Sequence, residues 1–484
     1  MAPQENLSKI AKEGFAIIDE FYSRSRRQES QICEYPVQKS YPIWRSFATP
    51  KTIDSNQAAK RYGGIESMVA TQQSRKMTSR ANTFAVLILC SALAVCNAAN
   101  GQQAGHRNLA GVVELVKTFN VLNYGAKPGS QQESTQAFSK AWQEACGFIG
   151  NGRVRVVIPP GIYKLSELIF QGPCKSPTPI TILLQGTLQA VSDISAYPNQ
   201  AWISFDEING LILTGGGTID GQGQALWEYN DCKTNPDCTH LPAAIHMSKV
   251  QNAKIKSINM INSMGFHMHI TQSYLVRLHS LHITSPGDSP NTDGIHISKS
   301  NTIKISRNVI KTGDDCISIG QGSTNVTINQ ITCGPGHGIS VGSLGKVPNE
   351  MDVRGLIVKN STLIGTTNGI RIKTYPASGP SRASGMLFKD IIMDNVKNPI
   401  IINQNYGSDS TQPSQVRISD VVYQNIRGTT ISPLAVSLNC SSLVPCQNVH
   451  FQNINLQHIA NQKLTSTCAN AKVGYFGVQN PPPC

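Results

Sequence analysis

Residues 326–333 read Val-Thr-Ile-Asn-Gln-Ile-Thr-Cys, "VTINQITC", and their pattern decides the fold. Apolar side chains occupy the first, third, sixth and eighth positions, so the alternation slips by one residue in the middle. Strict alternation is typical of a strand with one buried face. The slip therefore predicts two short strands joined by a tight corner, with the apolar side chains of both strands facing one interior.

The same pattern recurs through the second half of the chain at roughly 23- to 33-residue intervals, which is the range of a solenoid. Clear copies begin at Ala253, Val276, Val326, Met386, Val416 and Val449, and looser ones at Ile303 and Leu356. One unit cannot bury its apolar face alone, whereas stacked units share a continuous core. We therefore predict an all-β, right-handed parallel β-helix over residues 115–484, with Asn and Ser near the corners forming hydrogen-bonded ladders between coils.

The open ends of a solenoid need covering. The stretch "STQAFSKAWQEAC" (134–146) carries Ala and aromatic residues at helical spacing, and Ser134 is placed as its N-cap. We expect this capping helix to close the N-terminal end. A cysteine-containing tail that ends in "NPPPC" is expected to tie down the other end.

A second strand follows each apolar unit, and four of these strands align on their buried isoleucine and valine pairs. The four segments are "NTDGIHIS" (291–298), "GDDCISIG" (313–320), "GHGISVG" (336–342) and "TNGIRIKT" (367–374). In this register Asp293, Asp315, His337 and Asn368 share one position; His296, Ser318, Ser340 and Arg371 share a second; Ser298, Gly320, Gly342 and Lys373 share a third. Alternation turns these polar side chains outward. Since neighbouring coils lie about 4.8 Å apart, they should form one compact patch.

The patch combines three carboxylates, one imidazole and two fixed cations. The members are Asp293, Asp314, Asp315, His337, Arg371 and Lys373. Three crowded carboxyl groups cannot all ionise at their usual pKa values, so at least one should hold a proton. A protonated acid beside an ionised base is what glycosidic hydrolysis needs. Arg371 and Lys373 together suit a substrate carboxylate, which points to an acidic sugar.

Four motifs in this patch resemble the signature motifs of the polygalacturonases, the pectin-hydrolysing family of glycoside hydrolases. They are Asn291-Thr292-Asp293, Gly313-Asp314-Asp315, Gly336-His337-Gly338 and Arg371-Ile372-Lys373. The resemblance runs from "FNVLNYGAK" (119–127) to the C-terminus. Over this length the sequence is most similar to plant, pollen-type exopolygalacturonases. It implies secreted, exo-acting hydrolysis of α-1,4-galacturonosyl linkages in pectate, with inversion.

The resemblance also implies roles for single residues. Asp314 would be the general acid, while Asp293 and Asp315 would orient and deprotonate the water. His337 would tune the acid. Arg371, Lys373, Asn291 and Tyr406 would bind the substrate. The chain departs from the family at Asn403 and Gly407, where the family usually has Asp and Cys, which puts in doubt the stability of that loop and the placement of Tyr406.

Several alternatives stay open at this level. An endo-acting enzyme, a calcium-dependent pectate lyase and a catalytically weak pectate-binding wall protein fit the same patch. Inverting glycosidases generally have more widely separated carboxyl groups than retaining ones. Because neighbouring coils hold these carboxyl groups close together, that rule would favour retention.

The formal net charge of +13 favours a polyanionic partner, namely nucleic acid, acidic lipid or acidic polysaccharide, although solubility alone also accounts for it. The patch selects the acidic polysaccharide. We expect no nucleic acid, no stable membrane association, no cofactor and a monomer. Neither a CxxC motif nor a Cys/His metal spacing is present, so we expect no metal site.

The segment "RKMTSRANTFAVLILCSALAVCNAANGQ" has the basic start, short apolar run and small-residue end of a secretory signal peptide. It begins near Met77, so we interpret residues 77–99 as an internal signal peptide and residues 1–76 as an upstream extension of unknown function. The alternative is a signal anchor that makes a membrane protein. Sequons at Asn325, Asn360 and Asn439 fit a secreted glycoprotein.

Of the 13 cysteines, Cys33 lies in the extension and Cys90 and Cys96 lie in the signal segment, which leaves an even set of ten for disulfide bonds. Close spacing favours Cys232–Cys238, Cys316–Cys333, Cys440–Cys446 and Cys468–Cys484. Cys146 and Cys174 then remain for each other.

Overall fold

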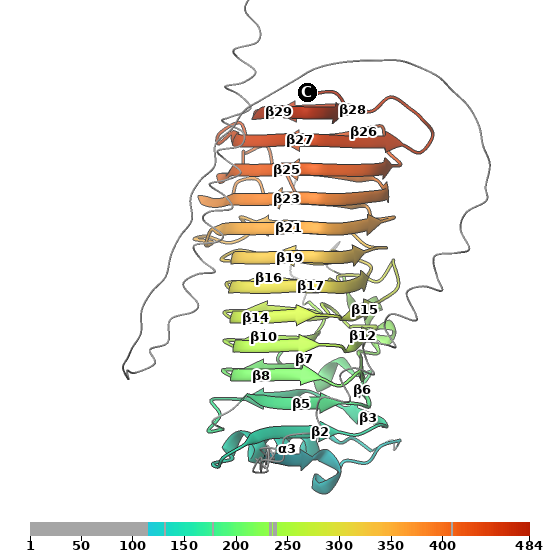
Figure 1. The fold of residues 1–484 in the computed structure, drawn as a ribbon, viewed down its shortest axis with the longest axis vertical. Coiled ribbons are helices and arrows are strands. Elements are labelled where there is room, and N and C mark those ends of the chain that lie inside the picture. The colour runs from blue at the N-terminus through green and yellow to red at the C-terminus, as the bar shows by residue number, and fades with distance from the viewer. Residues whose placement is uncertain (1–114, 130–131, 177–178, 232–234, 236–239, 408–409) are drawn as a thin grey trace, which may run out of the picture. The chain divides into compact units, whose positions relative to one another are not determined.

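Parallel strands stack coil upon coil in the computed structural model, which describes residues 115–129, 132–176, 179–231, 235, 240–407 and 410–484 (Figure 1). The residue 1–76 extension, the 77–99 signal segment and the Cys232–Cys238 pair lie outside the described residues. No helix within those ranges is long and apolar enough to cross a membrane. The predicted all-β parallel β-helix is confirmed.

Two sheets run along the solenoid, and every strand pairing in them is parallel. The 18-stranded sheet contains β1 (Val116–Asn120), β2 (Arg153–Ile158), β3 (Ile162–Leu165), β5 (Ile180–Leu184), β6 (Thr187–Ala190), β8 (Asn209–Thr214), β9 (Thr218–Asp220), β11 (Gln251–Lys256), β12 (Asn259–Ile261), β14 (Tyr274–His279), β15 (His282–Thr284), β17 (Asn301–Lys311), β19 (Thr324–Cys333), β21 (Val353–Ile364), β23 (Ser381–Val396), β25 (Val416–Thr430), β27 (Cys446–His458) and β29 (Ala471–Asn480). The 11-stranded sheet contains β4 (Leu168–Gln171), β7 (Ala201–Asp206), β10 (Ala243–Ser248), β13 (Met268–Thr271), β16 (Ile295–Ser298), β18 (Ile317–Ile319), β20 (Ile339–Leu344), β22 (Asn368–Thr374), β24 (Asn398–Asn403), β26 (Leu434–Asn439) and β28 (Thr465–Ala469).

The mid-unit slip in the repeat comes from one residue in the left-handed backbone conformation. Ser280 (φ 57°), Gln330 (φ 58°) and Asn453 (φ 53°) occupy that position in three coils. A single left-handed residue turns the chain while keeping the apolar side chains on both sides of it facing inward. In the coils of β11 and β14 the corner separates two strands, as expected, whereas β17 and the later long strands run through it unbroken.

The predicted start of one copy of the repeat is wrong. We predicted a unit that starts at Val416, but the register pairs Val421 with Met386 on one side and with Val449 on the other. The unit in register therefore starts at Val421. The pattern is ambiguous here because β25 passes two left-handed residues, Asp420 (φ 56°) and Asn425 (φ 53°), and the apolar spacing fits either side of the first.

The predicted ladders between coils are present at the corners. The Asn453 amide donates to Asn425 Oδ1 (3.2 Å), and the Asn425 amide donates to Asp390 Oδ1 (2.8 Å). Aromatic rings form a parallel stack inside the core, where Tyr423 lies 5.1 Å from Phe388 and 4.9 Å from Phe451 between ring centroids. Each coil thus contributes to both a polar and an apolar column, which keeps the strands in register.

The predicted capping helix is α3 (Thr135–Gly147), at the end of the stack next to β2 (Figure 1). Its buried face includes Phe138 and Trp142, and the Trp142 ring packs edge-on against Phe170 of β4 at 5.0 Å. Ser134 stands at the N-cap but makes no capping hydrogen bond. Its hydroxyl instead accepts from the Lys127 backbone N–H (3.3 Å). Four short 3-10 turns, η1 (Val121–Tyr124), η2 (Ile194–Ala196), η3 (Gly223–Ala225) and η4 (Trp227–Tyr229), complete the described helical segments.

Four of the expected cysteine pairs are disulfide bonds. They are Cys146–Cys174, Cys316–Cys333, Cys440–Cys446 and Cys468–Cys484. The last pair joins β28 to the C-terminal residue, so the cysteine-containing tail is tied back to the final coil.

Candidate active site

Four neighbouring strands of the 11-stranded sheet, β16, β18, β20 and β22, carry the candidate residues. The predicted register is confirmed for the inward-facing positions Ile295, Ile317, Ile339 and Ile370 and for the outward-facing positions His296, Ser318, Ser340 and Arg371. The isoleucines are completely or almost completely buried. Their burial fixes the opposite face of the same strands as the place where the polar side chains meet.

The third predicted position does not hold along all four strands. The register between β20 and β22 shifts after Val341, so that Leu344 pairs with Thr374. Gly342 therefore has no ladder partner at Lys373, contrary to the alignment. An irregularity of this kind re-aims the side chains beside it, and here it lies at the strand that carries Lys373.

Asp315 is the most tightly held carboxylate of the group. Its Oδ1 accepts from Ser340 Oγ and from Arg371 Nη2, both at 2.7 Å, and its Oδ2 accepts from Lys373 Nζ at 2.9 Å. The residue is 1% exposed. Burial alone would raise the pKa of Asp315, but the charges of Lys373 and Arg371 and their hydrogen bonds hold it below its usual value. Asp315 is therefore ionised in the folded protein.

Asp293 lies in the opposite electrostatic situation. Burial, followed by the charges of Asp314 and Asp315, raises the pKa of Asp293 well above its usual value. Its Oδ2 accepts from Ser318 Oγ (2.7 Å), and the same hydroxyl lies 2.8 Å from His296 Nδ1. When Asp293 is ionised, the Ser318 proton goes to it, so His296 donates from Nδ1 and its Nε2 is left as an acceptor. Burial lowers the pKa of His296 to about 4, so this ring is neutral.

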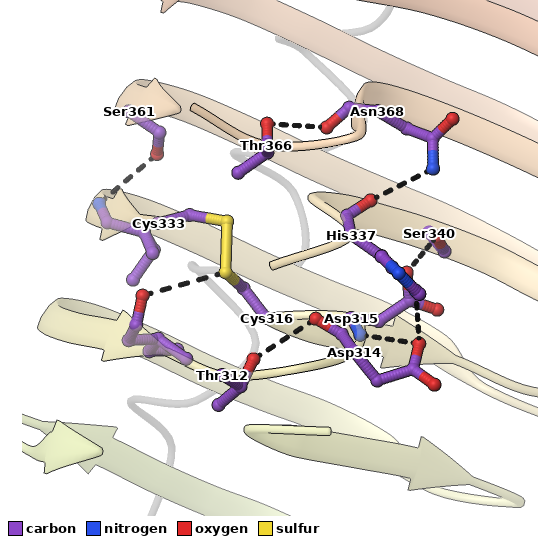
Figure 2. The surroundings of a disulfide bond; sticks show 12 residues. Thr312, Asp314, Asp315, Cys316, Cys333, His337, Ser340, Ser361, Thr366 and Asn368 are labelled. Atoms are coloured by element: carbon purple, nitrogen blue, oxygen red, sulfur yellow. Dashed lines mark hydrogen bonds and ion pairs between the residues drawn. A yellow bond between two sulfur atoms is a disulfide. The ribbon is translucent and has the colours of Figure 1, made fainter. Parts of the chain in front are cut away.

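Asp314 and His337 form the more open part of the site (Figure 2). His337 Nδ1 lies 2.8 Å from Asp314 Oδ1, which also accepts from the Asp315 backbone N–H (2.8 Å). The side chains of Asp314 and His337 are 20% and 39% exposed. Asp314 is thus the carboxyl group of the three that an incoming substrate reaches most easily.

The backbone around the two adjacent acids is fixed by close packing. Gly313 approaches Ser289 so closely that an added Cβ would lie 2.0 Å from the Ser289 carbonyl oxygen. The Gly313 N–H donates to Thr292 Oγ1 (3.0 Å). On the other side, the Cys316–Cys333 disulfide joins the start of β18 to the end of β19 through the core (Figure 2). The acidic pair therefore has rigid support on both sides.

Tyr406 lies beside the two cations. Its ring centroid is 5.0 Å from Lys373 Nζ and 5.8 Å from the Arg371 guanidinium carbon, so both cations face an aromatic ring. Tyr375 packs edge-on against Tyr406, with 5.7 Å between the ring centroids. A Cβ added at Gly407 would approach the Tyr375 ring to 3.1 Å. Despite the departures at Asn403 and Gly407, the Tyr406 ring lies at the two basic residues.

Asn291 precedes β16 on a half-buried loop in the left-handed conformation (φ 51°). Its Oδ1 accepts from the Asn230 amide (3.0 Å), a residue that follows η4. The two asparagines tie loops of different coils together next to Asp293.

Sequence reasoning missed the two serines that connect the charged groups. Ser318 links Asp293 to His296, and Ser340 Oγ donates to Asp315 while it accepts from Arg371 Nε (3.0 Å). The sequence pattern places both serines on the outward face but assigns them no role. Their position in the same register column as His296 and Arg371 was the signal that could have found them.

Asp314, Asp315 and His337 bring potential metal-ligand atoms within 4.8 Å of one another. The chemistry of the group disfavours a metal ion, because both oxygens of Asp315 already face cationic side chains. A divalent cation there would be repelled by Arg371 and Lys373. The arrangement is better suited to proton transfer beside a bound anion.

Comparison with known proteins is consistent with this chemistry. The model of the family "Glycosyl hydrolases family 28" matches residues 146–477. The chain belongs to this family. Among curated proteins, one relative is the "Exopolygalacturonase" of Platanus acerifolia, which is 43% identical over 77% of this chain and 98% of its own length.

Two solved structures support the family 28 fold. The endo-xylogalacturonan hydrolase from Aspergillus tubingensis is 26% identical, with a TM-score of 0.65 over 75% of this chain and 100% of that one. The exopolygalacturonase from Thermotoga maritima is 17% identical, with a TM-score of 0.64 over 75% of this chain and 91% of that one. The second likeness shows the fold alone.

Proposed function

We propose that this chain hydrolyses α-1,4-galacturonosyl linkages of pectate, removing residues from the chain end with inversion. The observation that carries the proposal is the unequal state of the three carboxyl groups. Asp315 is ionised and bound to two cations, Asp293 favours its protonated form, and Asp314 lies open to the outside. Carboxyl groups whose environments push their pKa values apart mark the acid and the base of a glycosidase.

Asp314 is the proposed general acid, which protonates the leaving glycosidic oxygen. Its Oδ1 interacts with the Asp315 backbone N–H and with His337, while Oδ2 makes no hydrogen bond to the described residues and is available to a substrate. His337 holds the carboxyl group in one orientation. This contact supports a role in tuning the acid rather than in attacking the sugar.

Asp293 and Asp315 are the proposed residues that orient and deprotonate the water. Asp315 is ready for this role because Arg371 and Lys373 keep it ionised. Asp293 must lose its proton first, since the free site favours its protonated form. We infer that Asp293 has released this proton by the time the water is deprotonated, while Asp314 supplies the proton for the leaving oxygen.

Arg371 and Lys373 are the proposed ligands of the substrate carboxylate. Each cation donates one hydrogen bond to Asp315 and has further N–H donors. Tyr406 covers them from one side, and Asn291 lies beside Asp293. A negatively charged sugar fits this arrangement better than a neutral one, because two cations face a single buried carboxylate of the protein.

The decisive experiment compares Asp314→Asn with Asp394→Asn, an exposed acid on β23 that serves as the control. We expect Asp314→Asn to lower kcat for reducing-end release from polygalacturonate by about 100- to 10,000-fold. Binding of polygalacturonate should survive, and Asp394→Asn should behave as wild type. Full activity of Asp314→Asn would overturn the mechanism.

Product analysis distinguishes the remaining modes of action. Monogalacturonate at the first time point supports exo action, whereas a spread of oligomers shows endo action. Unsaturated product ends would reveal a lyase, and binding without any product would reveal a wall-binding protein. NMR of the first product shows whether the anomeric configuration is inverted.

The proposed substrate also implies secretion to the cell wall. We propose that residues 77–99 direct the chain out of the cell and are removed, and that the secreted domain works as a monomer. N-terminal sequencing of the secreted protein tests this proposal. A mature protein that begins at Met1 would contradict it.

A further inference from the structure

Six basic side chains gather on the 18-stranded sheet, on different strands from the candidate active site. They lie on β11, β14 and β17, which belong to consecutive coils of the stack; Figure 1 labels β14 and β17, and β11 pairs with β14. We call this surface the basic face, and its members are Lys254, Lys256, Arg277, His279, Lys304 and Arg307. All six are half-buried or exposed, so their polar ends reach solvent.

Three of these cations stand in strict register across the coils. Lys254 pairs with Arg277, and Arg277 pairs with Lys304. Neighbouring strands lie about 4.8 Å apart, so the column places like charges side by side. Like charges directly opposite each other on a sheet are destabilising. A charge column of this kind therefore calls for a compensating anion.

The protein supplies no such anion among its described residues. Between residues 250 and 312 the sequence contains two acids, Asp288 and Asp293, and Asp293 belongs to the candidate active site. No ion pair involving the basic face occurs in the described part of the chain, whereas nearby Lys249 pairs with Glu207 (2.7 Å) and Arg354 pairs with Asp352. The uncompensated positive charge contributes to the lowered pKa of a neighbouring histidine. Burial, then Arg307 and Lys256, lowers the pKa of His279.

We propose that the basic face is a second, non-catalytic binding site for galacturonan, which holds the enzyme on its polymer while another chain end occupies the active site. The choice of occupant rests on the proposed function. A galacturonan carries one carboxylate on every sugar, and the basic face repeats one cation on every coil. A linear polyanion laid across the strands can thus meet several cations in succession.

The field of the basic face also suits the association step. A row of like charges without counter-charges raises the local concentration of a polyanion, and the effect weakens as salt screens it. Because the basic face lies on strands of the 18-stranded sheet and the candidate active site lies on strands of the 11-stranded sheet, a long polymer can contact the basic face without competing for Asp314. The increase in binding is therefore specific to long polymer chains.

The test uses the full secreted protein and a triple variant, Lys254→Gln, Arg277→Gln and Lys304→Gln. The matched control is Lys397→Gln, Lys463→Gln and Lys472→Gln, which removes the same charge from exposed lysines elsewhere. At about 50 mM salt we expect the basic-face variant to bind long polygalacturonate roughly 10-fold more weakly than the control does, and the difference to vanish at about 500 mM. Neutral galactan should bind neither variant.

Activity on trigalacturonate separates this proposal from the proposed function. The basic-face variant should keep wild-type kcat/KM on that short substrate, because its active site is intact. A wild-type chain that binds polygalacturonate through the basic face but hydrolyses nothing would overturn the catalytic proposal alone. Equal binding of polygalacturonate by the two triple variants would overturn the basic-face proposal. Tighter wild-type binding to duplex DNA or to phosphatidylserine vesicles than to polygalacturonate, lost in the same variant, would also overturn it.

Discussion

The active site and the basic face lie on neighbouring coils of one solenoid, but the environments of their cations are opposite. Arg371 and Lys373 are about nine-tenths buried and share the carboxylate of Asp315. Lys254, Arg277 and Lys304 stand next to one another at the surface with no ion pair in the described part of the chain. One group is locked in place by its partner, and the other leaves its charge available.

This difference shows what stacked coils can offer a function. Register alone brings side chains of neighbouring coils together, and the choice of residue decides the result. A buried, balanced network fixes geometry, because every charge in it has a partner whose loss is costly. A surface column of one sign fixes little, yet it produces a field that extends into solvent. The following predictions test this contrast, from the largest effect to the smallest.

Removing a cation should be costly in the network and nearly neutral on the basic face. Lys373→Met leaves the buried Asp315 carboxylate with one cation fewer, so we expect a loss of about 3–5 kcal/mol in the free energy of unfolding. Lys304→Met removes an unpaired surface charge and should stay within about 0.5 kcal/mol of wild type. Urea denaturation at neutral pH measures both. Equal losses in the two variants would break the contrast.

Two disulfide bonds offer a matched pair for the question of rigidity. Cys316–Cys333 and Cys468–Cys484 close loops of similar length, with sequence separations of 17 and 16 residues. Replacing either pair by alanines should therefore lower stability by about 3 kcal/mol. Only the Cys316/Cys333 double variant should also lose kcat, because that bond supports the backbone next to Asp315. If both variants keep full kcat after correction for the folded fraction, rigidity at the acidic pair is not required.

The raised pKa of Asp293 makes the network less stable as pH rises. Above the pKa of the unfolded carboxyl group, near 3.8, the unfolded chain releases a proton that the folded chain retains. Folding stability contributed by Asp293 therefore falls as pH increases toward its folded pKa. Asp293→Asn removes this penalty, so the variant should gain stability relative to wild type between pH 4.5 and 7.5, by about 1.4 kcal/mol for each unit of pKa difference.

The control for this pH prediction is Asp288→Asn, which changes an exposed acid. Its stability difference from wild type should be the same at pH 4.5 and at pH 7.5. A loss of relative stability by Asp293→Asn as pH rises would show that Asp293 is ionised in the folded site.

The smallest expected effect is at Ser318. Its hydroxyl lowers the pKa of Asp293, although burial and the neighbouring carboxylates outweigh it. Ser318→Ala should therefore raise that pKa further and move the acidic limb of the kcat/KM profile to higher pH, with a stability loss of about 1 kcal/mol. Ser306→Ala, on the strand of the basic face, should leave the profile unchanged. An unshifted acidic limb in Ser318→Ala would exclude Asp293 as the base.

The sequence predicts the fold well because its signals are local and repeated. Alternation fixes which side chains of a strand face inward, and eight copies of one unit leave little choice of architecture. Apolar spacing identified the other copies, and the same criterion misplaced the copy at Val416. The strand β25 carries apolar residues on both sides of two corners, so spacing alone allows two registers.

The site was predictable in its members but not in their connections. Aligning the isoleucines was enough to gather Asp293, Asp315 and Arg371 on one face. The alignment gave no sign of the register shift after Val341, nor of Arg371 and Lys373 binding Asp315. Hydrogen-bond partners depend on side-chain conformation and on small displacements of the backbone, and neither leaves a spacing pattern.

The capping helix has a consequence for how such a molecule stays soluble. The first strand of a stacked sheet exposes unpaired backbone groups, which invite another chain to add to the stack. At β4 the indole N–H of Trp142 donates to the Gln171 carbonyl oxygen (3.0 Å), so α3 occupies a position that an incoming strand would use. The helix thereby acts as a terminator of growth. A solenoid that repeats so regularly needs such a stop, because nothing in the repeat itself limits the number of coils.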